Sequence, residues 1–380
     1  MYRLHVGVWL GTVGPSALNV GFSHSGLPAF IGISLTLLLV GWFSLAEACR
    51  VEEPAKPSPR VLHKHIVDSC TFEERSALAL SAEEVLTALG KGHSVDLLGV
   101  VVKGDLSFDR LPLLPIQQQP ISSSRIKEKF KERGLEEVRV IPGAMIIRES
   151  WFQGLIATNL RDGALVIFGP VDMDKTKFEK SLDFSKTVFL DPVNFSGTTI
   201  AYEGFFIGAH FDNTANFRNT VFGTHTRFHK ALFGETAIFN HAGFHGLAEF
   251  LEVEFAGKAD FSQTFFKHGT GFSGTQFRGA SDFSQALFER EAYFRFATFE
   301  QNASFRGTRF KAVADFTNAQ FNENFDFANA VFEGTPKVEG SEKIFKKQQV
   351  ENIARPTSQI AIFVGLFLLV LVFVWRLRRK

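Results

Sequence analysis

Phenylalanine recurs along the second half of the chain in two interleaved series, each with a period of 11 residues. The first series starts at Phe178 and the second at Phe184, so the spacing between rings alternates between six and five residues. Of 29 positions in the two series, 28 hold Phe and one holds Ile200. The predicted core ladder is Phe178, Phe184, Phe189, Phe195, Phe206, Phe211, Phe217, Phe222, Phe228, Phe233, Phe239, Phe244, Phe250, Phe255, Phe261, Phe266, Phe272, Phe277, Phe283, Phe288, Phe294, Phe299, Phe305, Phe310, Phe316, Phe321, Phe327 and Phe332.

A small or β-branched residue stands two positions before nearly every ring, as Thr187 does before Phe189. Residues two apart lie on the same side of an extended strand, so each unit predicts a short strand with a small residue and a ring facing inward. Gly or Asn often follows two residues after a ring of the second series, where a turn is expected. A helical repeat is excluded, because six residues advance a helix by about 600° and would place the two series about 120° apart.

Three units show the repeat most clearly, with the sequences ADFSQ at 259–263, ASFRG at 303–307 and ADFTN at 314–318. They resemble the pentapeptide-repeat family, whose pattern is A-(D/N)-(L/F)-x-x. The resemblance covers about 165–335 and implies a right-handed quadrilateral β-helix in which four units make one turn. Every second unit of this chain has a sixth residue, so one turn takes 22 residues instead of 20. This departure indicates corners or bulges that differ from those of an ideal square coil.

We therefore predict an all-β solenoid, a right-handed quadrilateral β-helix with short capping helices and with transmembrane helices at the ends. A capping box at 81–84 (SAEE) predicts the start of the N-terminal cap helix. The expected parts are a signal peptide or signal anchor at 1–48, a linker at 49–80, a cap helix with degenerate first coils at 81–165 that includes an insert at 109–140, the repeat β-helix at 166–335, a cap helix or linker at 336–356, a transmembrane helix at 357–375 and a basic tail at 376–380.

The two ends of the chain predict its location. Residues 27–45 carry no charge and are long enough to span a bilayer, as are residues 357–375. The sequence leaves open whether the first segment is cleaved. Basic residues at 376–380 follow the second segment directly and favour a cytoplasmic C-terminus. We expect a single-pass or two-pass protein of the bacterial cytoplasmic (inner) membrane, with the repeat domain outside the cytoplasm.

Composition adds to this interpretation. The chain has 44 Phe but only 4 Trp and 3 Tyr, and a buried Tyr or Trp would leave a polar group without a partner. The net charge of +1 argues against a nucleic-acid binder, which needs a basic surface. The 2 cysteines cannot make a disulfide-rich scaffold or a four-cysteine zinc site. Outside the cytoplasm, Cys49 and Cys70 could form a disulfide.

No catalytic motif is recognisable, so we predict no catalytic, cofactor-binding or metal site and no enzyme activity. His225 with His229, and His241 with His245, have the four-residue spacing of metal ligands on a helix. On a β-helix this spacing is expected to carry the second histidine round a corner. We therefore expect surface histidines at His210, His225, His229, His241, His245 and His268.

The predicted function is that of a non-enzymatic, membrane-tethered interaction or scaffold module with an unknown protein partner, no nucleic acid and no small-molecule substrate. Repeat proteins display variable outward residues on a constant core. The alternative is a cytoplasmic-facing DNA-mimic binder of a type II topoisomerase, as some members of the family are. That function requires a strongly acidic rod, whereas residues 167–336 hold 20 Asp and Glu against 15 Lys and Arg, a net charge of −5.

Overall fold

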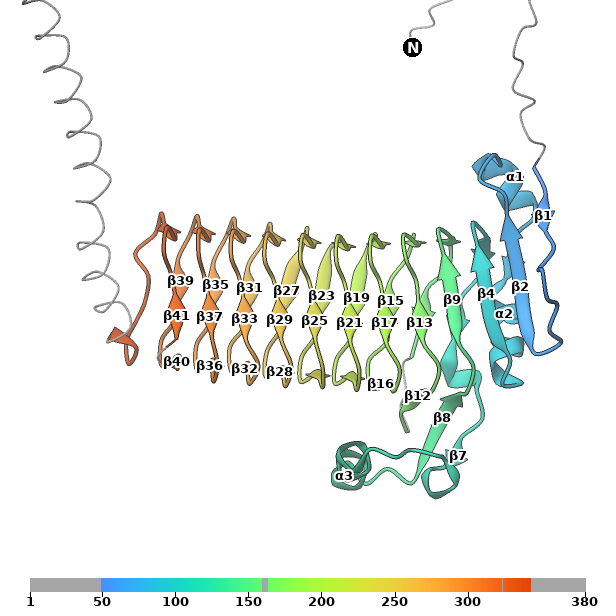
Figure 1. Cartoon of the computed structure of the whole chain (residues 1–380), viewed down its shortest axis with the longest axis horizontal. Helices are drawn as coiled ribbons and strands as arrows, with labels where there is room; N and C mark the ends of the chain where they lie inside the picture. The colour runs from blue at the N-terminus through green and yellow to red at the C-terminus, as the bar shows by residue number, and fades with distance from the viewer. Residues whose placement is uncertain (1–48, 159–162, 323, 343–380) are drawn as a thin grey trace, which may run out of the picture. The chain divides into compact units, whose positions relative to one another are not determined.

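The chain folds as a β-solenoid of parallel strands (Figure 1), seen in a computed structural model that describes residues 49–158, 163–322 and 324–342. The strands form four sheets, which we call faces 1 to 4 in the order in which the chain visits them. The two predicted spans, at 27–45 and 357–375, lie outside the described residues. Within the described residues, every helix is too short or too polar to cross a membrane.

The four sheets contain strands of two to six residues. In order across the sheet, face 1 comprises β1 (Val51–Glu52), β2 (Val61–Ile66), β4 (Ser94–Leu98), β9 (Met145–Arg148), β13 (Val171–Asp172), β17 (Val193–Asn194), β21 (Ala215–Asn216), β25 (Ala237–Ile238), β29 (Ala259–Asp260), β33 (Ser281–Asp282), β37 (Ala303–Ser304) and β41 (Phe325–Asp326). Face 2 comprises β3 (Leu80–Ser81), β5 (Val101–Lys103), β10 (Trp151–Phe152), β14 (Lys177–Phe178), β18 (Thr199–Ile200), β22 (Val221–Phe222), β26 (Gly243–Phe244), β30 (Phe265–Phe266), β34 (Leu287–Phe288), β38 (Arg309–Phe310) and β42 (Val331–Phe332).

Faces 3 and 4 complete each coil. Face 3 comprises β6 (Leu106–Ser107), β11 (Ile156–Ala157), β15 (Leu182–Asp183), β19 (Glu203–Phe205), β23 (His225–Arg227), β27 (Leu247–Glu249), β31 (Thr270–Gly271), β35 (Ala292–Tyr293) and β39 (Ala314–Asp315). Face 4 comprises β7 (Leu114–Pro115), β8 (Glu137–Ile141), β12 (Leu165–Ile167), β16 (Thr187–Phe189), β20 (His210–Phe211), β24 (Leu232–Phe233), β28 (Glu254–Phe255), β32 (Gln276–Phe277), β36 (Thr298–Phe299) and β40 (Gln320–Phe321).

Within the repeat, strands pair in parallel with the strand 22 residues later, as in Val193↔Ala215 and Phe211↔Phe233. The expected four sides and 22-residue turn are therefore confirmed, and the right-handed sense stays a prediction. The first-series rings lie within the strands of faces 2 and 4, and the second-series rings directly follow the strands of faces 1 and 3. The alternation of six and five residues thus corresponds to two kinds of corner.

The rings stack along the solenoid axis. Phe261 stacks on Phe239 at a centroid distance of 4.7 Å and on Phe283 at 5.0 Å, with interplanar angles of 2°. It also meets Phe250 and Phe272, which come from the opposite face, edge to face at 5.3 Å. Both arrangements are favourable for aromatic pairs. The centre of the solenoid is therefore built from two columns of stacked rings that interlock edge to face.

Threonine in the small inward position has a structural role of its own. Thr264 is buried, and its hydroxyl donates to the carbonyl of Phe239 in the preceding coil at 2.8 Å. The hydroxyls of Thr198 and Thr308 make the same bond to the carbonyls 25 residues before them. Near the end of the described chain, Ser341 donates to the Phe316 carbonyl at 2.9 Å. These bonds satisfy buried hydroxyls that would otherwise cost about 1–3 kcal/mol each.

The corners after faces 1 and 3 require a left-handed backbone. Every eleventh residue from Lys175 to Gly340 has a positive φ, between 51° and 75°. Gly and Asn were expected there, and they do occupy several of these corners. Other corners hold residues with longer side chains, among them Lys230 at φ 56°. Each of those residues adopts a conformation that costs an L-amino acid about 1–2 kcal/mol.

The solenoid starts earlier than the predicted repeat at 166–335. Strands β4, β5 and β6 already form three sides of a coil, and β8 to β12 continue it. Aliphatic side chains such as Met145, Ile147 and Leu165 fill the inward positions of these coils. The linker expected at 49–80 is wrong, because β2 pairs in parallel with β4 and extends face 1.

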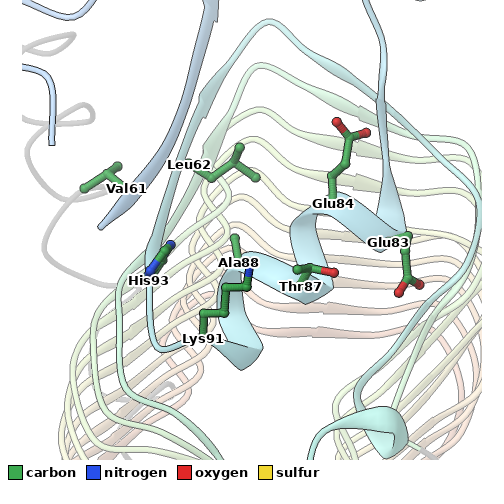
Figure 2. Close-up of a pocket in the computed structure, with 8 residues that line it drawn as sticks. All are labelled: Val61, Leu62, Glu83, Glu84, Thr87, Ala88, Lys91 and His93. Atoms are coloured by element: carbon green, nitrogen blue, oxygen red, sulfur yellow. The ribbon is translucent and has the colours of Figure 1, made fainter. Parts of the chain in front are cut away.

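The N-terminal end of the solenoid is closed by two short helices with capping boxes, α1 (Phe72–Ala77) and α2 (Ala82–Gly90). The predicted capping box at Ser81 and Glu84 is confirmed. Helix α2 lies across the open end of the coils and buries Val85 and Leu89 against them (Figure 2). This helix therefore shields the first coil's apolar interior from water.

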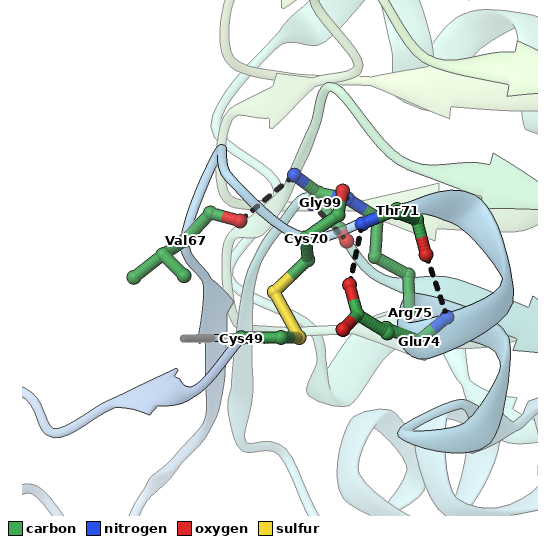
Figure 3. Close-up of a disulfide and its surroundings, with 7 residues drawn as sticks. All are labelled: Cys49, Val67, Cys70, Thr71, Glu74, Arg75 and Gly99. Carbon is green, nitrogen blue, oxygen red and sulfur yellow. Dashed lines mark hydrogen bonds between the residues drawn. A yellow bond between two sulfur atoms is a disulfide. The ribbon is translucent and has the colours of Figure 1, made fainter. Parts of the chain in front are cut away.

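A disulfide joins Cys49 to Cys70 beside these helices (Figure 3). The buried side chain of Arg75 lies next to it and donates to three backbone carbonyls, those of Val67 at 2.9 Å, Cys70 at 3.0 Å and Gly99 at 2.6 Å. Loss of this guanidinium would remove a donor from all three carbonyls, of which that of Val67 would keep the backbone N–H of Cys70. The disulfide closes the segment 49–80 on itself, and the bond from Arg75 to Gly99 fastens this segment to the first coil.

The insert at 109–140 replaces one corner of the first coil, between β6 and β8. It contains two 3-10 turns, at Phe108–Arg110 and Ile116–Gln118, and the helix α3 (Ser124–Glu132) (Figure 1). Helix α3 buries Ile126 and Phe130 in a second hydrophobic cluster that includes Val166 and Val188 of face 4. The insert therefore covers part of the outer surface of face 4.

The stacked core predicts a large penalty for removing one ring. Phe261→Ala deletes a fully buried ring from the middle of one column and should lower the free energy of unfolding by about 3–5 kcal/mol. Phe265→Ala is the matched control, because this ring points outward from the same coil and is only half-buried. Urea denaturation measures both, and equal midpoints for Phe261→Ala and wild type would show that the ring does not support the core.

The left-handed corners predict a gain in stability at Lys230. Lys230→Gly removes the strain of a positive φ, which outweighs the greater freedom of Gly in the unfolded chain, and should stabilise by about 0.5–1 kcal/mol. The exposed Lys230–Glu252 pair, at 3.6 Å, contributes little. Lys230→Ala keeps the strain and should leave stability unchanged. Thermal melts would contradict the assignment if Ala stabilised as much as Gly.

Candidate functional site

The outer surface of face 3 carries large exposed side chains. We call it the face 3 patch and define it by Phe205, Arg227, Leu247, Glu249, Tyr293, Arg295 and Phe296. Phe296 is 62% exposed and Leu247 is 48% exposed. Residues 22 apart lie side by side on neighbouring strands, so Phe205, Arg227 and Glu249 form one continuous column.

Arg227 is held in place from two sides. Its guanidinium lies 5.7 Å from the centre of the Phe205 ring, a cation–π distance. Its Nε donates to Glu249 Oε2 at 2.8 Å. The preceding coil therefore supplies the ring and the following coil supplies the carboxylate.

Arg295 makes a similar pair of contacts three coils further along, but with a ring from its own coil. Its guanidinium lies 5.6 Å from the centre of the Tyr293 ring, and its Nε donates to Asp315 Oδ2 at 2.7 Å. Burial alone would raise the pKa of Asp315, but hydrogen bonds from Thr317 and Arg295 outweigh it and lower the pKa. The carboxylate therefore stays ionised and keeps Arg295 oriented.

Two of the predicted surface histidines also face Glu249. His225 Nε2 lies 2.7 Å and His229 Nε2 lies 3.5 Å from Glu249 Oε2. As expected from the four-residue spacing, His225 lies in β23 and His229 in the turn that follows it. Both reach the same carboxylate because Glu249 projects from the next strand between them. Burial would raise the pKa of Glu249, but the bonds from His225 and Arg227 and the charge of His229 lower it.

His210, also expected at the surface, is buried. It lies on β20 of face 4, and its Nε2 is 3.2 Å from Asp212 Oδ1. Burial, together with the positive charges of Lys129 and Arg125 on α3, lowers the pKa of His210 to about 3. The imidazole is therefore neutral at physiological pH. The sequence did not show this burial because the covering helix comes from an insert about 80 residues earlier in the chain.

The recurrent Asp and Asn between the small residue and the ring have a structural explanation. Asp260 Oδ1 accepts from the backbone N–H of Ser262 at 3.1 Å, and Asp282 Oδ1 accepts from that of Ser284 at 2.8 Å. The structure does bring Asp260 and Asp282 side by side on face 1. Each carboxylate is already committed to its own turn, so the column serves the corners of the solenoid.

The structure contains both the predicted ladder of rings and the disulfide. The ladder rings are buried, except that Phe321 and Phe332 in the last coils are half-buried. Cys49 and Cys70 are bonded to each other. The face 3 patch was not identified from the sequence. Its signal was the 22-residue spacing of Phe205, Arg227 and Glu249, which becomes visible once the outward positions are aligned coil by coil.

A shallow cavity of about 360 Å³ opens at the N-terminal end, over α2 (Figure 2). Leu62 and Ala88 form apolar parts of its lining, and Glu83 and Glu84 are the carboxylates at it. Glu83 is paired with Arg110 and Glu84 with its capping box. Both carboxylates are therefore engaged in holding the cap together.

Two segments of the chain, residues 206–253 and 297–341, match the family described as pentapeptide repeats (9 copies). These two segments, about a quarter of the chain, are similar to pentapeptide repeats. The first matched segment includes Arg227 and Glu249 of the face 3 patch. Coils of the same four-sided form continue without a break between the two segments. No curated protein and no solved structure matches the chain.

The burial of His210 predicts loss of stability in acid. Below pH 6.5 the unfolded chain binds a proton that the folded protein, with a pKa of about 3, does not bind. Stability therefore falls as the pH drops from 6.5 towards 3, by about 1.4 kcal/mol per pH unit. Gln does not titrate, so His210→Gln avoids this loss. The change in free energy of unfolding that the substitution causes should therefore be about 2 kcal/mol more favourable at pH 5 than at pH 7. Urea titrations at both pH values measure this, with the exposed His268→Gln as control; an equal response of the two variants would contradict the assignment.

Proposed function

We propose that this pentapeptide-repeat protein is a membrane-tethered, non-enzymatic interaction module whose face 3 patch binds a protein partner. The observation that carries the proposal is the pair of oriented arginines, Arg227 and Arg295, each placed against an aromatic ring. Arg and aromatic residues are enriched at the energetically important positions of protein interfaces. Because stacked coils and ion pairs already hold these side chains, little conformational freedom is lost on binding.

The chemistry of the patch favours a protein over other ligands. Apolar and charged groups alternate within it, with Leu247 exposed on the strand of Glu249 and Phe296 exposed directly after Arg295. Such a mixed surface suits a polypeptide, whereas a nucleic acid would require an excess of basic side chains. Between the two arginines, Gly269 and Gly271 lie next to the side chains of Leu247 and Leu251 from the preceding coil, so apolar atoms cover the backbone there.

The proposed location is outside the cytoplasm of a bacterial cell, with the chain held in the inner membrane. The Cys49–Cys70 disulfide supports an oxidising compartment. The apolar segments at 27–45 and 357–375 are the proposed tethers, and the basic residues 376–380 favour a cytoplasmic C-terminus.

A capture experiment tests the patch. Full-length protein carrying Leu247→Ser, Tyr293→Ser and Phe296→Ser should lose the partners that wild type retains from solubilised membranes, by tenfold or more in quantitative mass spectrometry. The matched control carries Val221→Ser, Leu287→Ser and Val331→Ser, three outward apolar positions on face 2. Equal losses from both variants, or none from the first, would argue against the face 3 patch.

Reporter fusions test the orientation separately. A fluorescent reporter that folds only in the cytoplasm should be bright at the C-terminus, and alkaline phosphatase should be inactive there. The opposite result would place the repeat domain in the cytoplasm and favour the topoisomerase-binding alternative.

A further inference from the structure

A cluster of two histidines and one carboxylate lies on the outer surface of face 1, where the sequence predicted no metal site. His63 and His65 stand two apart on β2, so both imidazoles project from the same side of the strand. Asp96 projects from the neighbouring strand β4, directly opposite His63 in the parallel register. The three side chains belong to the folded segment before the repeat and take no part in the face 3 patch.

The donor atoms are spaced like the ligands of one small cation. His63 Nδ1 lies 3.2 Å from Asp96 Oδ2, and His65 Nε2 lies 3.0 Å from Asp96 Oδ1. One ligand atom from each residue falls within 4.8 Å of the others. In a tetrahedral zinc site with bonds of about 2.0–2.1 Å, neighbouring ligand atoms lie about 3.3 Å apart. Each observed separation is therefore close to one edge of such a tetrahedron, although the two are measured to different oxygens of Asp96.

The surroundings leave room for a fourth ligand. The cluster opens into a cavity of about 460 Å³ that is also lined by Glu52 and Glu53. Glu52 is the direct cross-strand partner of His65 in the antiparallel β1–β2 pair, and its side chain is exposed. Directly opposed residues of an antiparallel pair share one face of the sheet. A carboxylate or a water molecule can therefore complete the coordination.

Two positive side chains near the cluster oppose a cation, Arg148 and Lys56, and Lys56 also lines the cavity. Arg148 Nη2 lies 3.8 Å from Asp96 Oδ1. The contact is longer than a hydrogen bond, and the Arg148 side chain is 39% exposed, so it can turn into solvent. Its charge should weaken metal binding without blocking it.

We propose that His63, His65 and Asp96 bind one Zn²⁺ ion at the N-terminal end of the solenoid. Two imidazoles and one carboxylate with an open position form a ligand set that suits a borderline divalent metal. The ion would link β2 to β4 and so join the disulfide-fastened segment to the first coil. This proposal is independent of the face 3 patch and of the membrane orientation.

Calorimetric titration with zinc chloride tests the site on full-length protein in detergent, stripped with a chelator and free of any polyhistidine tag. Wild type should bind one Zn²⁺ per chain. His65→Asn should weaken binding by about 100-fold or more, since even residues behind the ligands are worth about 10–100-fold. Asp96→Asn should have the same effect, whereas Arg148→Gln should tighten binding by about tenfold because it removes a nearby positive charge.

His225→Asn is the matched control. It alters the other cluster of two histidines and a carboxylate, in which Arg227 already occupies Glu249, and it should bind zinc like wild type. The proposal is overturned if wild type binds no zinc, if binding survives both His65→Asn and Asp96→Asn, or if His225→Asn loses it equally. If a ligand variant fails to fold, the visible absorption spectrum of wild type loaded with cobalt(II) in place of zinc tests the site. An intense visible band supports tetrahedral coordination, and a spectrum like that of the aqueous ion contradicts it.

Discussion

The structure depends on a match between two distances. Neighbouring strands of a sheet lie about 4.8 Å apart, and the Phe261 ring stacks on its neighbours at 4.7 and 5.0 Å. A ring in one coil can therefore stack on the same ring in the next coil without any change in backbone spacing. The match holds only if every coil puts a ring at the same position, which explains the strict 22-residue register. It also excludes Tyr and Trp, whose polar atoms would be enclosed.

Much of the solenoid could be predicted because the core uses one residue type at fixed intervals. The stacked columns and several of the left-handed corners follow from the positions of Phe, Gly and Asn, and the four sides follow from the resemblance to pentapeptide repeats. The first coils were harder to recognise, since Met145, Ile147 and Leu165 fill the same inward positions with different side chains. The segment 49–80 was interpreted as a linker because β2 pairs with a strand that lies 33 residues later, outside the 22-residue period.

The surface sites depend on contacts that the sequence does not order in a simple way. Arg227, His225, His229 and Glu249 converge only because one coil places a carboxylate between two histidines of the coil before it. His210 is buried by a helix from a distant insert. His63 and His65 meet Asp96 across a strand pair that no repeat predicts. Each case requires knowledge of which strands are neighbours, and the chemistry then follows from ordinary distances.

Because the coils stack in parallel at a constant spacing, the distance between two surface residues along the solenoid axis is fixed by the number of coils between them. Arg227 lies on β23 and Arg295 lies just after β35, a strand three steps further along face 3, which corresponds to about 14 Å along the axis. This interval is set by counting coils and does not depend on how loops pack. Insertion or deletion of one 22-residue turn between them would change the interval by about 4.8 Å. Because a whole turn is added or removed, each arginine would keep its direction from the solenoid axis. The spacing of contacts on such a surface can therefore change in fixed increments, separately from the identity of the residues that make them.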